Sequence, residues 1–129
     1  MKSLNNYILE KLVLRKGMKS DNQFYKYETT ESDKTKNMQQ FNRVFGTLKE
    51  IQDVLNFEPQ ESNAPMNNRN PHIIFLGAYY DKGKEHPFAV MDDGMNTVGS
   101  IKDGDADVYW LIYSYEKEVS QYVYDTLLK

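Results

Sequence analysis

Apolar side chains recur every three or four residues in three stretches of the chain, which is the spacing that lines one face of a helix. The first stretch covers residues 3–16, where Ser3 suits the beginning of a helix and Gly17 suits its end. The second predicts a long amphipathic helix over 37–57, and the third predicts a closing helix over 116–129. The stripe of the long helix consists of Met38, Phe41, Phe45, Leu48, Ile51 and Leu55.

Four runs after Pro71 have the composition of strands, and an aromatic run at 22–30 predicts an additional edge strand. The pair Asp93 and Gly94 favours a tight hairpin between the second and third runs, because both residues tolerate positive φ. Period-two alternation in the last run places its tyrosines on one face and its Trp110 on the other. The four runs cover residues 72–80, 87–91, 95–101 and 108–115.

This order of elements predicts an α+β fold, in which an antiparallel four-stranded meander packs with the long amphipathic helix. Helices at the N- and C-terminal ends complete the fold. We expect residues 1–17 to form an N-terminal amphipathic helix that is a candidate leader. Residues 18–129 then form a single α+β domain with a polar, Asn- and Pro-rich loop at 58–71. With helices on one sheet face, the tyrosine face of 108–115 is either a contact surface or packs under the helices.

Composition narrows the classes of protein to which the chain can belong. The 129 residues suffice for one domain, and the mean hydropathy of −0.74 excludes a transmembrane protein. The absence of cysteine excludes disulfides, thiolate metal sites and a cysteine nucleophile. Aromatic residues make up 13% of the chain, and ten of them are tyrosines.

The formal net charge of −3 is distributed unevenly. Residues 1–20 carry five basic side chains and one acidic one, whereas residues 91–107 carry five aspartates and one lysine. Proteins that bind single-stranded nucleic acid combine stacking rings with a basic groove, and the second half of this chain is acidic. The charge therefore argues against a nucleic-acid partner and leaves a protein partner as the expectation.

Motifs for common catalytic chemistry are missing, including phosphate-binding glycine loops and the HExxH zinc motif. His72 and His86 could join Asp92 or Asp93 in a metal site of two histidines and one carboxylate, but the spacing does not require it. The segment 103–107 has the carboxylates of a calcium loop without its later glycine and glutamate. We therefore predict no catalytic residue, no metal and no cofactor.

The candidate binding residues are tyrosines, acidic residues and one arginine of the polar loop. Tyrosine supplies rigid contact area and a hydrogen bond at low entropic cost, which suits recognition of a protein. The self-association of the chain is left open by the sequence. The candidate residues are Tyr109, Tyr113, Tyr115, Asp92, Asp93 and Arg69.

The first residues, Met-Lys-Ser-Leu-Asn-Asn-Tyr-Ile-Leu-Glu-Lys-Leu, carry a resemblance to a known class of leader. Residues 1–16 resemble the leaders of small proteins of tailed bacteriophages, especially crAss-like phages of gut Bacteroidetes, and leaders that bring proteins into phage proheads. In those leaders the head protease cuts after an Ile/Leu-x-Glu pattern, which Ile8 and Glu10 match.

The resemblance implies a phage or mobile-element protein that resides in the virion or the bacterial host cytoplasm. We expect that it is not secreted, because Glu10 and Lys11 interrupt the first apolar run and no small-residue cleavage site follows. The leading hypothesis is a non-enzymatic binding protein, with the virion or phage head as its expected location. The alternative is an inhibitor of a host defence or host enzyme that acts through the acidic, tyrosine-rich sheet face. A third hypothesis, an enzyme that uses the histidines and aspartates, depends on a bound metal.

Overall fold

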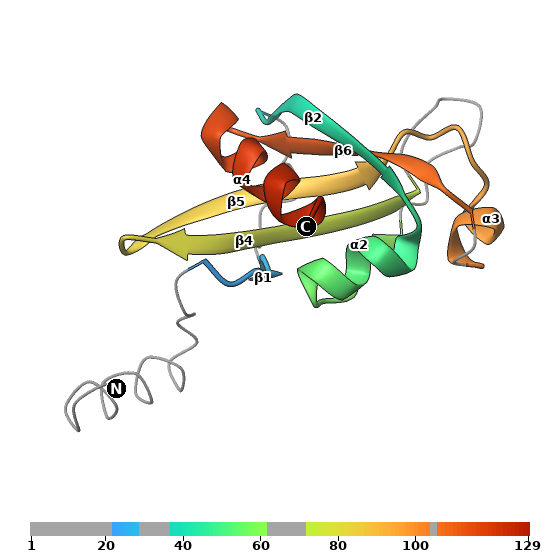
Figure 1. Ribbon diagram of the computed structural model, residues 1–129, viewed down its shortest axis with the longest axis horizontal. Coiled ribbons are helices and arrows are strands. Elements are labelled where there is room, and N and C mark those ends of the chain that lie inside the picture. Colours follow the sequence, from blue (N-terminus) through green and yellow to red (C-terminus); the bar gives the residue numbers. More distant parts are fainter. Residues whose placement is uncertain (1–21, 29–36, 62–71, 104–105) are drawn as a thin grey trace, which may run out of the picture.

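The computed structural model describes residues 22–28, 37–61, 72–103 and 106–129. Within these ranges the chain forms a mixed α+β fold with a six-stranded antiparallel sheet and three helices (Figure 1). The predicted N-terminal helix, with Ile8 and Glu10, lies outside the described residues, as does Arg69. No helix of the described part is long and apolar enough to cross a membrane.

The sheet has the strand order β1-β4-β5-β6-β2, and β3 also pairs with β4. Strand β2 therefore forms one edge of the sheet, while the short strand β1 lies along the outer side of β4 (Figure 1). The short strand β3 pairs along the same side of β4. The elements, in chain order, are β1 Tyr25–Lys26, β2 Gln39–Gly46, α2 Leu48–Leu55, β3 Gln60–Glu61, β4 Ile73–Asp81, β5 Lys84–Asp92, α3 Val98–Lys102, β6 Val108–Ser114 and α4 Lys117–Leu127.

Helices α2 and α4 lie on the same side of the sheet (Figure 1), which we call the closed face. Its core is continuous across three strands, because Phe75, Val90 and Ile112 are register partners and all are fully buried. Trp110 is also fully buried there, and its indole N–H donates to the carbonyl of Gly46 at 3.0 Å. The helices contribute Ile51, Leu55, Val119 and Val123 to this core. We call the opposite side the open face.

Gly77 is required where β4 passes beneath the core. A Cβ atom at this position would lie 2.7 Å from the ring of Phe57 and 2.8 Å from the ring of Phe88, distances that real Cβ contacts do not reach. The missing side chain therefore allows two aromatic rings to approach the backbone of a central strand.

Several predicted elements are confirmed. The runs 72–80, 87–91 and 108–115 correspond to β4, β5 and β6, and the closing helix is α4. The turn between the first two is a tight hairpin, in which Lys82 and Gly83 both have positive φ. The predicted edge strand at 22–30 is present as β1, which pairs with β4.

The predicted long helix over 37–57 is wrong in its first half. Residues 39–46 form strand β2, and only residues 48–55 are helical. The change occurs at Thr47, whose side chain accepts from the backbone N–H of Glu50, while the Glu50 carboxylate accepts from the backbone N–H of Thr47. This capping box begins the helix at residue 48, and pairing with β6 stabilises the preceding residues as a strand.

The predicted strand at 95–101 is also wrong, and with it the hairpin at Asp93 and Gly94. Residues 98–102 form α3, whose first turn is capped by the Thr97 hydroxyl. The meander consequently consists of β4, β5 and β6, and β2 supplies the next strand from earlier in the chain. Part of the predicted loop at 58–71 is strand β3, while residues 62–71 lie outside the described ranges.

Candidate functional site

An exposed cluster of one cation and two aromatic rings lies on the open face where β2 and β6 pair. Phe45 and Tyr109 are register partners, so their side chains lie on the same side of the sheet. Their ring centroids are 4.8 Å apart, and the guanidinium carbon of Arg43 lies 4.7 Å from the centre of the Tyr109 ring. Phe45 is 57% exposed and Tyr109 is 41% exposed, and Arg43 is exposed as well. We call these three residues the edge patch.

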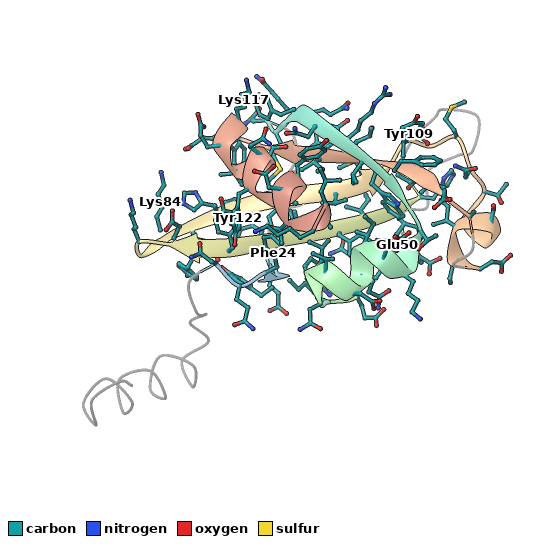
Figure 2. The ribbon with its side chains drawn as sticks, in the orientation of Figure 1. Phe24, Glu50, Lys84, Tyr109, Lys117 and Tyr122 are labelled. Atoms are coloured by element: carbon teal, nitrogen blue, oxygen red, sulfur yellow. The ribbon has the colours of Figure 1, made fainter. Side chains whose placement is uncertain are left out.

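The strand geometry of β2 places the patch. Arg43 and Phe45 are two residues apart, so both point to the open face, while Val44 between them is buried on the closed face. A bulge between Gln40 and Asn42 interrupts the register before this point, and the pairing with β6 is regular from Asn42 onward. The patch is therefore built on two paired strands whose backbones are fixed by the sheet. Figure 2 shows Tyr109 near the end of β6 that lies beside α3.

Beyond the patch, the open face carries apolar side chains that are half-buried, apart from Ala89, which is fully buried. Register partners across the strands bring together apolar side chains that no described helix covers. These register partners form two rows that lie side by side across the sheet. The first row consists of Arg43, Leu111, Met91 and Ile74, and the second consists of Gln40, Tyr113, Ala89 and Leu76.

The sequence-predicted tyrosines do not form one cluster: Tyr109 and Tyr113 lie on the open face, whereas Tyr115 lies beyond the strand. Tyr113 is half-buried, and Tyr115 is 42% exposed just beyond the end of β6. Tyr115 lies six residues from Tyr109, which is about 20 Å along an extended strand. It borders a separate hollow of about 120 Å³, together with Lys84, Glu85, His86, Pro87, Glu116 and Val119. Only Tyr109 belongs to the edge patch.

The two candidate aspartates differ in environment. Asp92 is 1% exposed and accepts three backbone N–H bonds, from His72 at 2.6 Å, Ile73 at 2.8 Å and Gly94 at 3.0 Å. Asp93 is half-buried and accepts one bond, from the N–H of Met95 at 3.0 Å. The hydrogen bonds of Asp92 therefore link the start of β4 to the end of β5, and its carboxylate oxygens face the backbone rather than solvent.

The histidines are not brought together. His72 is buried, with its Nδ1 3.5 Å from Asp92 Oδ2, and neither ring nitrogen has a hydrogen-bond partner among the described residues. His86 pairs with Tyr79, six residues from Asp92 along β5. Among the residues that the structure describes, no three His, Asp or Glu side chains gather as metal ligands.

The hydroxyls of Tyr25 and Tyr79, at the end of the sheet opposite to the edge patch, are held in their neutral form. Burial raises the pKa of Tyr25, and the hydrogen bond that its hydroxyl donates to the Glu85 carboxylate raises that pKa further. Burial is the main effect that raises the pKa of Tyr79 to about 12. The side chains of Tyr122, Asp81 and Glu116 make smaller contributions in the same direction. Hydroxyl groups with raised pKa values are poor nucleophiles and poor bases at neutral pH.

Another hollow lies at the end of α2. It has a volume of about 360 Å³, and Gln52 within it donates from its amide to the Glu58 carboxylate at 2.8 Å. Its lining consists of Gln52, Asp53, Asn56, Phe57 and Glu58. Apart from Phe57, the lining is polar and holds no cationic group or histidine.

The sequence identified Tyr109 but missed Arg43 and Phe45, because both were assigned to the long helix. The alternation of exposed and buried side chains at Arg43, Val44 and Phe45 appears only in the structure; the signal in the sequence was Gly46, a poor helix former inside the expected helix. Comparison of the chain with known protein families, curated proteins and solved structures finds no significant match.

Proposed function

We propose that this chain is a non-enzymatic protein-binding module whose contact surface is the edge patch and the adjoining apolar rows of the open face. The observation that carries the proposal is the exposed contact between Phe45, Tyr109 and Arg43. Aromatic residues and arginine are enriched at the centres of protein interfaces, where they supply most of the binding free energy.

The geometry supports a binding role because the patch is already ordered. The Tyr109 ring contacts both the Phe45 ring and the Arg43 guanidinium, on strands whose backbones are paired. A partner would therefore bury these side chains without first restricting their rotation, a cost of about 0.5–1.5 kcal/mol per mobile side chain. The half-buried rows beside the patch add apolar area.

Substitution of the patch tests this proposal. The immobilised chain is used to capture partners, and binding to each purified partner is then measured by calorimetry for Tyr109→Ala and for Leu128→Ala. Leu128 is a matched control, because it is a 57% exposed apolar residue beyond α4 and distant in sequence from the patch. We expect Tyr109→Ala to weaken binding by about tenfold or more, as for central interface residues, and Leu128→Ala to leave the Kd unchanged. If the wild type and both variants bind the partner with equal affinity, the proposal that the edge patch is the contact surface is refuted.

The cellular setting that we propose is the virion of a tailed phage, as the resemblance of residues 1–16 suggests. Mass spectrometry of purified particles tests this setting, and we expect a mature N-terminus immediately after Glu10. Absence from the particles would reject the head-associated setting. Binding and inhibition of a purified host enzyme through the open face would then support the inhibitor setting in its place.

A further inference from the structure

The two edges of the sheet differ in how they are terminated. Along the outer side of β4, the two-residue strand β3 pairs with residues 73–74 and the two-residue strand β1 pairs with residues 77–78. On the opposite edge, β2 has eight residues and pairs only with β6 among the described strands (Figure 1). An edge strand of this length presents unpaired N–H and C=O groups to another chain.

The regular part of β2 is suited to pairing with itself. The bulge lies before Asn42, so residues 42–46 form an uninterrupted segment in register with β6. If two copies meet antiparallel with Val44 on the two-fold axis, Arg43 of one copy lies directly opposite Phe45 of the other. Asn42 then lies opposite Gly46.

This register is complementary in its distribution of charge. Arg43 carries the only charge in β2, and the axis at Val44 places it across from an aromatic ring rather than from the second Arg43. A guanidinium against an aromatic face is attractive, and Arg43 already makes such a contact with Tyr109 in its own chain. Two symmetric contacts of this kind would form on the open face.

We propose that this chain forms a homodimer by antiparallel pairing of the β2 edges, with Val44 on the two-fold axis. The pairing joins two sheets into one and brings the two edge patches together across the axis. Because only five residues of each strand take part, the buried area is small, and the dimer is a weak one that dissociates on dilution. The inference stands on the edge of β2 that no other described strand pairs with, and it is independent of any other protein partner.

Sedimentation velocity of the full chain over a range of concentrations tests the pairing. We expect the wild-type mass to rise from that of the 15.1 kDa monomer towards twice this value as concentration increases. Phe45→Lys places a lysine opposite Arg43 of the second copy on both sides of the axis, so the dimer Kd should rise by about tenfold or more. Leu128→Lys adds the same charge at a side chain of equal exposure, 57%, and should leave the dimer intact.

A second substitution tests the register itself. Adding Arg43→Glu to Phe45→Lys places a glutamate opposite each new lysine, and the dimer should return. Since all of these side chains are exposed, circular dichroism is expected to show the same fold for each variant. A wild-type chain that stays monomeric, a dimer that is insensitive to Phe45→Lys, or a double variant that stays monomeric would each overturn the proposed pairing.

The test separates this inference from the proposed binding function. Tyr109 lies on β6, one strand in from the edge, so Tyr109→Ala is expected to impair partner binding and leave the β2 pairing in place. A monomeric chain that still loses its partner on Tyr109→Ala would reject the dimer alone. A dimer with unchanged partner binding in Tyr109→Ala would reject the use of the patch alone.

Discussion

Asp92 provides the most direct test of how this fold is held together. Its carboxylate is 1% exposed and accepts backbone N–H bonds from His72, Ile73 and Gly94. Asp92→Asn preserves the shape of the side chain but replaces one oxygen with an NH₂ group. The amide oxygen can still accept the bonds from His72 and Ile73, which share Oδ1, whereas the NH₂ group would face the N–H of Gly94 donor to donor.

The expected loss of stability follows from these contacts. A hydrogen bond to a charged group contributes about 1.5–3 kcal/mol, and a buried donor left without an acceptor costs about 1–3 kcal/mol. In the variant one of the three bonds is lost, and the other two are made to a neutral amide oxygen in place of a charged carboxylate. Asp92→Asn should therefore lower the free energy of unfolding by about 2–3 kcal/mol. The adjacent Asp93 accepts one bond in a half-buried loop, so Asp93→Asn should change the same quantity by about 0.5 kcal/mol or less.

Urea unfolding at neutral pH, followed by tryptophan fluorescence, measures both variants. Trp110 is the register partner of Asp92 and is the single tryptophan, so the probe reports on this end of the sheet. If Asp92→Asn unfolds within about 0.5 kcal/mol of the wild type, as expected for Asp93→Asn, the argument that Asp92 fastens β4 to β5 is refuted.

Other predictions use the same unfolding measurement. Gly77→Ala should lower the free energy of unfolding by about 1–3 kcal/mol, because its Cβ would overlap two core rings. Gly99→Ala in α3 is the control and should be neutral or stabilising, because its Cβ would meet no atom within 4 Å. If Gly77→Ala leaves the stability unchanged, the close approach of the two rings to the Gly77 backbone is contradicted. Thr47→Ala should cost about 1 kcal/mol through loss of the capping box, and an unchanged midpoint would count against it. Because the pKa of Tyr79 is about 12 in the fold and 10.0 when exposed, the unfolded chain loses this proton first. Stability should therefore fall by about 1.4 kcal/mol per pH unit between those values, and Tyr79→Phe should make this decline shallower.

The elements that the sequence predicted well are those whose local signals agree. Strand β6 alternates strictly, and its buried Val108, Trp110 and Ile112 lie on the face that the alternation assigned to them. The runs at 72–80 and 87–91 are strands as predicted, namely β4 and β5. In these segments the pattern of side chains and the tertiary contacts favour the same structure.

The segment 37–57 shows where such reasoning failed. Its apolar residues fall at helical spacing throughout, yet the first half is a strand, because β6 offers a partner for its backbone along residues 39–46. The threonine and glutamate of the capping box mark the true helix start in the sequence, but the continuous helical spacing obscured them. Residues 95–101 failed similarly, since Thr97 caps a short helix in place of a returning strand.

By itself, the sequence determined the α+β class, the strands β4, β5 and β6, the closing helix and the absence of cysteine chemistry, because periodicity and composition are local properties. Only the tertiary structure decided that β2 is a strand at the sheet edge and that Arg43 and Phe45 meet Tyr109 on the open face. It also decided that Asp92 faces the backbone of two strands. Each of these contacts joins residues far apart in the chain, and their pairing depends on sheet register, which no local pattern specifies.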